Sequence, residues 1–254
     1  RDIPAFLYLP SDYTKGTTIP FVVTYHGGPE GQHRPGFDSV TQYLLTRGFG
    51  VLLPNVRGSI GYGRDYQMLD NYKKRWDSVR DGVDAAEWLV KMGYAAPGRI
   101  ATYGGSYGGF MSVACVVEDA ERVERSERKE LLFGSCVDVV GVVNLKSFLE
   151  KTSGYRRKLR EVEYGPLTDP DFLATISSIN RVDKIQIPVF VAHGFNDPRV
   201  PVEEAMQLAI ALKDQGRDPR VFIAPDEGHG FVKLDNRIYF NERMASFLAE
   251  TIGK

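Results

Sequence analysis

Three polar residues, Ser106, Asp197 and His229, have side chains that could together perform nucleophilic catalysis. Ser106 is the central residue of segment 104–108, whose sequence GGSYG fits the pattern G-x-S-x-G. This pattern is typical of a serine at the tip of a tight turn between a strand and a helix, with glycines where side chains would collide with nearby backbone. A neutral hydroxyl is a weak nucleophile, so a base such as His229 must remove its proton. A carboxylate such as Asp197 would orient that imidazole and stabilise its charged form.

The elements that would position these three residues are strands. Each of the three follows a segment predicted as a strand, at residues 100–103, 187–194 and 220–224. The carboxyl ends of parallel strands lie along one edge of a sheet, so the three loops can converge there. The order along the chain, serine, then aspartate, then histidine, is the order found in α/β-hydrolases.

Two other histidines and one other acid compete with this assignment. His26 and His193 also stand at strand ends, but His26 precedes the serine and His193 precedes the aspartate, so neither keeps the order. Asp226 lies only three residues before His229, which is too close for a separate loop to present it. We therefore predict Asp197 and His229 as the partners of the serine, and His193 as a structural histidine.

A pair of glycines follows another predicted strand, at residues 20–25, in the sequence His26-Gly27-Gly28-Pro29. Glycines at the carboxyl end of a central strand let backbone amides point into the crevice above the sheet. We predict that the loop at Gly27-Gly28 supplies one donor of an oxyanion hole. The backbone N–H of Tyr107, the residue after Ser106, would supply the other.

The hydrophobic pattern predicts an α/β fold of the α/β-hydrolase type, in which a mostly parallel central sheet carries helices on both faces. Buried strands alternate with amphipathic helices, and the 254 residues fit one catalytic domain at 1–254. The predicted strands cover residues 3–9, 20–25, 49–54, 100–103, 131–143, 187–194 and 220–224. The predicted helices cover 39–46, 77–92, 201–215 and 236–252, and one more begins at about residue 107.

Three further stretches have a distinctive composition. Residues 55–63 are rich in glycine, but they lack the Lys-Ser/Thr of a P-loop and no helix is expected promptly after them, so we expect a loop packed beside Ser106. Residues 118–130 alternate acidic and basic side chains, which is typical of a solvated helical face. Residues 144–168 show no clear sheet period and are a candidate lid or pocket wall. The basic cluster within them is interpreted as solvent-exposed surface and consists of Arg156, Arg157, Lys158 and Arg160.

The composition is that of an ordinary soluble globular protein, with 43% hydrophobic residues, 26% charged residues and a net charge of −1. It indicates neither nucleic acid nor an acidic membrane as a partner, and no apolar run approaches the roughly 18 residues that cross a bilayer. We expect a cytoplasmic location, and the oligomeric state stays open.

Cys115 and Cys136 lie in apolar stretches and are expected to be buried free thiols. No zinc-ligand spacing is present, and neither a metal nor another cofactor is expected.

Five motifs make the chain resemble the catalytic domain of the prolyl oligopeptidase family of serine peptidases, and its acylaminoacyl peptidase and dipeptidyl peptidase branches in particular. The motifs are HGGP at His26–Pro29, NVRGSIGYG at Asn55–Gly63, GGSYGGFM at Gly104–Met111, HGFNDPRVP at His193–Pro201 and DEGHGF at Asp226–Phe231. They extend over nearly the whole chain, so the resemblance is more specific than the serine turn alone.

The resemblance implies the triad predicted above. In dipeptidyl peptidases a tyrosine hydroxyl contributes to the oxyanion hole at the position where this chain has His26. Here the HGGP sequence favours the Gly28 amide, together with that of Tyr107. The resemblance also implies a substrate-binding S1 pocket near Tyr107, Val143, Phe148 and Val200.

Members of the family usually carry an N-terminal β-propeller domain that admits only small peptides. No blade repeat occurs in this sequence. The chain is therefore expected to be either an isolated catalytic part of a larger protein, with a propeller as its partner domain, or a stand-alone relative.

The leading hypothesis is a serine peptidase that hydrolyses short peptides through an acyl-enzyme. The same groups would also serve a carboxylesterase acting on small esters, which is the main alternative. A catalytically inactive binding module is a third possibility, disfavoured by the complete triad and the paired glycines.

Overall fold

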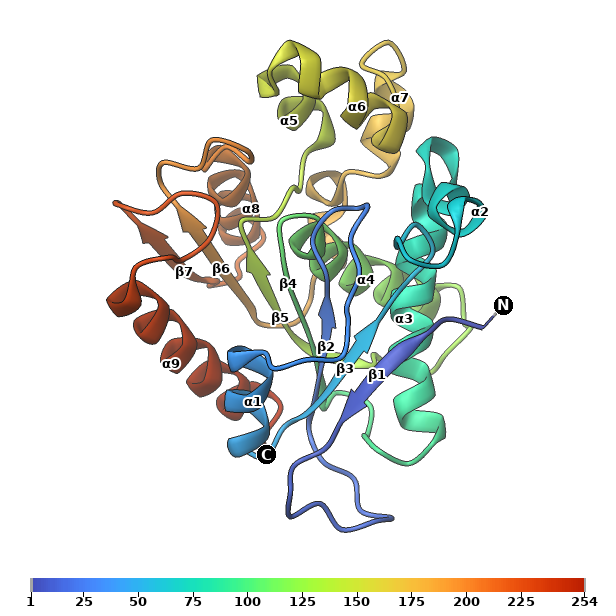
Figure 1. Ribbon diagram of the computed structural model, residues 1–254, viewed down its shortest axis with the longest axis vertical. Coiled ribbons are helices and arrows are strands. Elements are labelled where there is room, and N and C mark those ends of the chain that lie inside the picture. Colours follow the sequence, from blue (N-terminus) through green and yellow to red (C-terminus); the bar gives the residue numbers. More distant parts are fainter. Residues whose placement is uncertain (1, 254) are drawn as a thin grey trace.

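A seven-stranded sheet forms the centre of the computed structural model (Figure 1), which describes residues 2–253. Its strands lie in the order β1-β3-β2-β4-β5-β6-β7, and every neighbouring pair is parallel except β1 and β3. The mostly parallel sheet predicted from the sequence is thus confirmed. The strands are β1 (Ala5–Tyr8), β2 (Phe21–Tyr25), β3 (Gly50–Pro54), β4 (Ile100–Gly105), β5 (Phe133–Val139), β6 (Val189–Gly194) and β7 (Arg220–Ala224).

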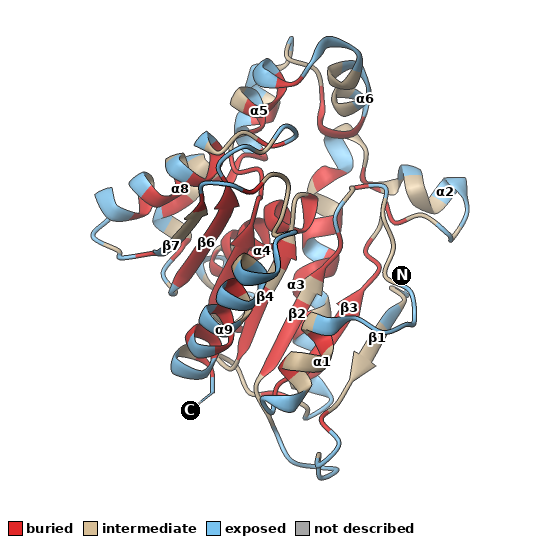
Figure 2. Ribbon diagram, turned by 60° about the vertical axis from the view of Figure 1, so that its left-hand side comes forward, coloured by how far each residue is buried: buried red, intermediate tan, exposed pale blue. Residues whose placement is uncertain are grey.

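Helices cover both faces of this sheet, as predicted. Helices α3, α4 and α8 pack on one face, and α1 and α9 pack on the other. Strands covered on both sides are apolar throughout, and Phe21, Val22 and Val23 of β2 are fully buried. Figure 2 shows the central strands in red for this reason, whereas the edge strand β1 is only partly buried. The helices are α1 (Ser39–Thr46), α3 (Arg75–Lys91), α4 (Tyr107–Glu124), α8 (Glu203–Asp214) and α9 (Leu234–Thr251).

Most of the chain between β5 and β6 lies beyond the carboxyl ends of the strands (Figure 1), and residues 178–184 then return along α4, where Arg181 pairs with Glu121. Two of its helix starts are fixed locally, because the side chains of Asn144 and Asp169 each accept a hydrogen bond of 3.3 Å from a backbone N–H in the first turn. We call residues 145–184 the cap segment, and it includes most of the stretch predicted as a lid or pocket wall. Its helices are α5 (Leu145–Lys151), α6 (Gly154–Tyr164), α7 (Pro170–Thr175) and the 3-10 helix η3 (Ser178–Lys184).

The loop at 55–63 is followed by short helical turns, contrary to the expectation from the sequence. Helix α2 (Arg64–Gln67) begins directly after Gly63, and the 3-10 turns η1 (Met68–Asp70) and η2 (Tyr72–Lys74) follow it. Turns of three or four residues are too short for a helical period to be visible in a sequence.

The charged stretch at 118–130 is not a fully solvated helical face. Glu118 and Asp119 at the end of α4 are buried. Glu118 accepts hydrogen bonds from the indole N–H of Trp76 (2.7 Å) and from Arg122 (3.0 Å). Asp119 accepts from the backbone N–H of Leu132 (2.9 Å) and of the residue after it, and so ties α4 to the start of β5. The prediction was wrong for these two acids, because buried partners elsewhere in the chain hold them.

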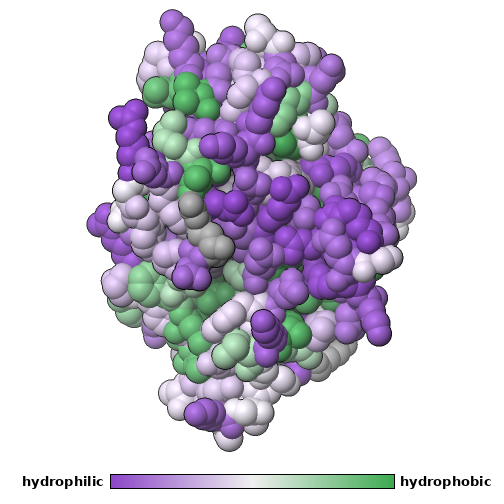
Figure 3. All heavy atoms as spheres, turned by 90° about the vertical axis from the view of Figure 1, so that its right-hand side faces the viewer, coloured by the Kyte–Doolittle hydropathy of each residue, from purple (hydrophilic) through white to green (hydrophobic). Residues whose placement is uncertain are grey.

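The surface and the cysteines agree with the composition. Figure 3 shows a face on which hydrophilic residues predominate at the centre and right, while hydrophobic residues gather mainly toward the lower left. Cys115 and Cys136 are free and buried, as predicted, and burial raises the pKa of both thiols. Within residues 2–253, no helix combines the length and apolar character required to span a membrane.

Candidate active site

Ser106 lies at a turn that only small neighbours permit. It is the single residue between β4 and α4, and its φ of 59° and ψ of −118° are values that L-residues rarely adopt. A side chain on Gly104 would collide with the backbone of Gly108, and one on Gly108 would collide with the carbonyl oxygen of Tyr25. The glycines around Ser106 are therefore required by the close approach of β2, β4 and α4.

Asp197 and His229 lie in neighbouring loops, after β6 and after β7. The carboxylate Oδ2 of Asp197 is 2.7 Å from Nδ1 of His229. The other oxygen, Oδ1, accepts hydrogen bonds from the backbone N–H groups of Arg199 (2.8 Å) and Val200 (3.0 Å). The aspartate side chain is fully buried, whereas the histidine side chain is 16% exposed. The loop after β6 thus holds the carboxylate in one orientation and presents the imidazole to the space above the sheet.

A second histidine, His193, lies behind Asp197. It is fully buried, its Nε2 donates to the carbonyl of Val200 at 3.0 Å, and it lies 3.5 Å from Oδ2 of the aspartate. Burial alone would raise the pKa of Asp197, but the hydrogen bonds from His193, His229 and two backbone amides hold it well below its usual range. The carboxylate is therefore an anion throughout the neutral pH range.

Ser106 and His229 line the same cavity, which has a volume of about 360 Å³. Within the described part of the chain the Ser106 hydroxyl makes no hydrogen bond, and a serine–imidazole contact commonly tightens only when substrate is bound. The other residues that line the cavity are Gly27, Gly28, Tyr107, Val142, Phe148, Arg156, Arg160, Tyr164, Arg199 and Val200.

The glycine loop after β2 lies next to the serine. A methyl group on Gly27 would stand 3.8 Å from Cβ of Ser106. The preceding residue, His26, is 2.8 Å from Oγ of Ser59 through its Nε2, and burial lowers the pKa of this imidazole, so it is neutral near pH 7. The loop at 55–63 therefore packs on the glycine loop, which separates it from Ser106, and none of its residues lines the Ser106 cavity.

Comparison with known proteins assigns the chain to a family. The model of the prolyl oligopeptidase family matches residues 35–254. The chain belongs to the prolyl oligopeptidase family. It is 30% identical over 265 residues to dipeptidyl aminopeptidase BIII of Pseudoxanthomonas mexicana, an alignment that covers 100% of this chain and 37% of that protein. It is 27% identical over 227 residues to the acylamino-acid-releasing enzyme of Arabidopsis thaliana, covering 88% of this chain and 29% of that enzyme.

A solved member of similar fold is a puromycin-hydrolyzing peptidase of Mycobacterium tuberculosis. It superimposes with a TM-score of 0.90 at 30% identity, covering 100% of this chain and 38% of the other. The prolyl oligopeptidase family makes the chain a serine-type hydrolase of the peptidase class. The chain spans between 29% and 38% of the length of these three relatives.

The structure brings most of the residues predicted from the sequence to this one cavity. Val143 is the exception, because its side chain is fully buried in the core and its backbone N–H donates to Glu204 at 3.0 Å, while Val142 lines the cavity instead. Asp226, the rival acid, pairs with Lys233 on the surface. The residues found at the cavity as predicted are Gly28, Ser106, Tyr107, Phe148, Val200 and His229, with Asp197 directly behind the histidine.

Sequence reasoning missed the charged part of the cavity. Arg156 and Arg160 of α6 and Arg199 of the loop after β6 all line it. The first two were visible as a basic cluster, which we interpreted as solvent-exposed surface. The only sequence signal for their role was their position inside the candidate lid.

A buried ion pair supports two residues that line the Ser106 cavity. Arg75 is completely buried and pairs with Asp70, which is also buried. Its guanidinium donates to the hydroxyl of Tyr107 (3.0 Å) and to the carbonyl of Glu163 (2.7 Å). It also lies over the rings of Tyr107 and Tyr164, at 5.2 and 4.9 Å from their centroids. Arg75 therefore links η1, the first residue of α4 and the end of α6.

Replacing Asp70 by alanine should lower the free energy of unfolding by about 3–5 kcal/mol, because Arg75 would keep its charge in the interior without a counter-ion. Urea unfolding followed by circular dichroism measures this. Glu250→Ala removes the acid of the exposed Arg220–Glu250 pair and should change stability little. Equal effects of the two substitutions would contradict a structural role for the buried pair.

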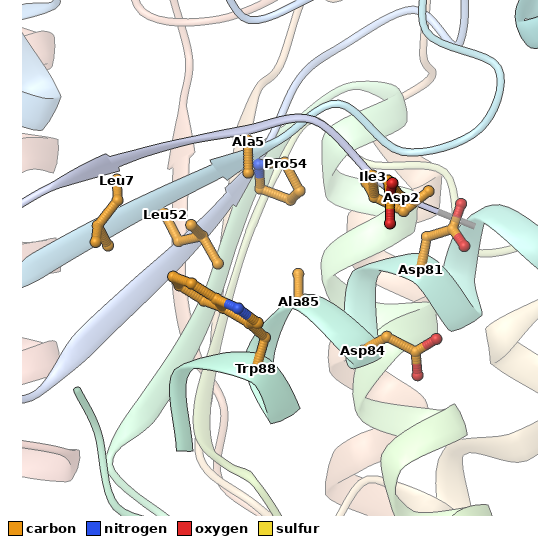
Figure 4. A pocket seen from close by; sticks show the side chains of 10 residues that line it. All are labelled: Asp2, Ile3, Ala5, Leu7, Leu52, Pro54, Asp81, Asp84, Ala85 and Trp88. Carbon is orange, nitrogen blue, oxygen red and sulfur yellow. The ribbon is translucent and has the colours of Figure 1, made fainter. Parts of the chain in front are cut away.

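A larger cavity, of about 470 Å³, lies between β1 and α3 (Figure 4). Its walls are mostly apolar, with Leu7, Leu52 and Trp88 on one side and the acids Asp81 and Asp84 at one end. None of its described lining residues is a serine, cysteine or histidine. Within the described residues, the serine and histidine that a serine-type hydrolase requires are thus missing from this cavity, whereas the smaller cavity has both in Ser106 and His229.

Proposed function

We propose that this chain hydrolyses short peptides as a serine peptidase, with Ser106 as nucleophile, His229 as general base and Asp197 as the group that orients the base. The observation that carries the proposal is the 2.7 Å hydrogen bond between Nδ1 of His229 and Asp197, combined with the position of His229 and Ser106 on one cavity. The membership of the chain in a family of serine peptidases supports the same reaction class.

The chemistry follows from these positions. With its Nδ1–H donated to Asp197, the imidazole carries a lone pair on Nε2 that can accept the proton of Ser106. The serine oxygen then attacks the peptide carbonyl. His229 returns the proton to the departing amine, which leaves an acyl-enzyme, and a water activated in the same way releases the acid.

The negative charge that develops on the carbonyl oxygen requires donors. The backbone N–H of Tyr107 lies in the first turn of α4, where N–H groups have no hydrogen-bond acceptor within the helix. We assign the second donor to Gly28, whose loop stands beside Ser106. Donors fixed by the fold stabilise the oxyanion without reorganising during the reaction.

The apolar part of the cavity suits an apolar side chain on the acyl side of the scissile bond. Val142, Phe148, Tyr164 and Val200 supply that surface. Relatives named for dipeptide, acylamino-acid and puromycin hydrolysis are consistent with small substrates. Because those relatives are roughly three times as long as the segment they share with this chain, we further propose that the whole protein carries another domain, such as a propeller, that limits substrate size.

Labelling with a fluorophosphonate, followed by peptide mapping, tests the nucleophile, and we expect modification at Ser106. The ratio of turnover on a peptidyl-nitroanilide to turnover on a p-nitrophenyl ester then tests the substrate class. Cleavage of the ester alone would favour a carboxylesterase with the same catalytic groups. A folded protein that does not label would favour an inactive binding module.

A further inference from the structure

The cavity beside Ser106 is lined by three arginine residues. Arg156 and Arg160 approach it from α6, and Arg199 approaches it from the loop after β6. Among residues 2–253, no aspartate or glutamate lines this cavity. A cleft lined by charges of one sign attracts and orients groups of the opposite sign.

Two of these three arginines lack a carboxylate partner. Arg160 pairs with Glu163 at 2.5 Å and donates to the carbonyl oxygen of Gly28 at 3.1 Å, both through one terminal nitrogen, so its charge is already balanced by a carboxylate. Neither Arg156 nor Arg199 forms an ion pair with any residue in the described range 2–253. Their hydrogen-bond donors are thus available to a ligand in the cavity.

The arginines of the basic cluster on α6 have different surroundings. Arg157 donates to the carbonyl of Thr152 at 3.1 Å and so serves the backbone of the cap segment. Arg156 lines the Ser106 cavity and also borders an adjoining hollow that contains Glu30 and Glu163. These two acids line the adjoining hollow and not the Ser106 cavity, so the charge on the cavity wall itself is positive.

We propose that the cavity binds a carboxylate of the substrate and that Arg156 selects for it. The planar guanidinium fork matches a carboxylate with two parallel hydrogen bonds. The substrate class is then a short peptide that carries an acidic group near the scissile bond, either an aspartate or glutamate side chain or a free terminal carboxylate. This inference rests on the proposed peptidase function of Ser106.

Two matched pairs of peptides test the inference by turnover. One pair differs only by glutamate against glutamine at a position beside the scissile bond, and the other by a free C-terminal carboxylate against an amide. For at least one pair, kcat/KM should favour the acidic member, and Arg156→Gln should reduce that preference roughly tenfold or more. Which pair responds identifies the source of the carboxylate. The matched control Lys158→Gln removes a charge from an exposed position of α6 outside the cavity and should leave the preference unchanged.

Binding to the Ser106→Ala variant separates this inference from the proposed function. Calorimetry with the same peptides should show tighter binding of the acidic member, and the double variant Ser106→Ala/Arg156→Gln should lose that difference. Acid-selective binding without turnover by the wild-type chain would uphold the carboxylate site and reject the peptidase assignment. Turnover with no preference in either pair, and equal binding of both members, would overturn the carboxylate site alone.

Discussion

Ser106→Ala is expected to lower kcat/KM for any peptide that the protein cleaves by roughly 10^3-fold or more, because it removes the proposed nucleophile. Alanine keeps the Cβ, so the substitution leaves the turn between β4 and α4 and its contacts with the glycines of that turn unchanged. Unfolding curves should therefore coincide with those of the wild type. Steady-state kinetics on a peptidyl-nitroanilide measures the loss.

Ser39→Ala is the matched control for this substitution. Ser39 is exposed at the start of α1, on the face of the sheet opposite α4, and its replacement should leave the rate unchanged. Retention of full activity by Ser106→Ala, in protein free of contaminating hydrolases, would remove the serine from the mechanism.

Asp197→Asn should lower kcat by about 10^3- to 10^4-fold, a loss of the size seen when a triad carboxylate becomes an amide. The carboxylate only accepts, and therefore holds the proton of His229 on Nδ1. In the variant, the side-chain oxygen would keep the hydrogen bonds from the backbone N–H groups of Arg199 and Val200, so the NH₂ group would face the imidazole. An NH₂ group donates to Nδ1 and therefore favours the tautomer with its proton on Nε2. The nitrogen that faces the serine would then carry a proton and could not act as a base.

Asp226→Asn provides the comparison for this loss. Asp226 lies three residues from His229, but it is bound to Lys233 and Asn236 on the surface, and its replacement should change kcat by less than about twofold. Comparable losses in the two variants would contradict the assignment of Asp197.

The pH dependence of stability gives a second measurement on Asp197. Its pKa in the folded protein is held below the value of about 3.9 expected in the unfolded chain. Its ionised form therefore stabilises the fold above that pH, and this contribution is lost as the pH falls toward the folded-state value. The difference in unfolding free energy between the wild type and Asp197→Asn should be larger at pH 7 than at pH 3.

The strand ends and the serine turn could be predicted because their signals are local. Residues 39–46 were predicted as a helix, with Gly48 just beyond its end, and form α1 with the same bounds. The turn at Ser106 was recognisable because its glycines are required by contacts close in sequence or on the neighbouring strand. Parallel strands then bring the loops of Asp197 and His229 to the same edge without further information.

The cavity wall could not be predicted in the same way. A run of arginines and lysines has the same sequence pattern whether it faces solvent or a cleft, and Arg156 reaches the cavity only because the cap segment folds over the strand ends. The burial of Glu118 likewise depends on Trp76, which is far away in sequence. Val142 lines the cavity in place of Val143. The loop after β5 has no hydrophobic period, so the sequence does not show which of the two side chains faces the cavity.

The cap segment is one uninterrupted stretch, and the turns that carry Ser106, Asp197 and His229 are encoded outside it. Phe148, Arg156, Arg160 and Tyr164 of the cap segment line the Ser106 cavity, so one part of the surface that would contact a substrate is encoded apart from these turns. Grafting residues 145–184 from another member of the family should change the substrate preference, while the host keeps its reaction steps and the part of the preference set by Tyr107, Val142 and Val200.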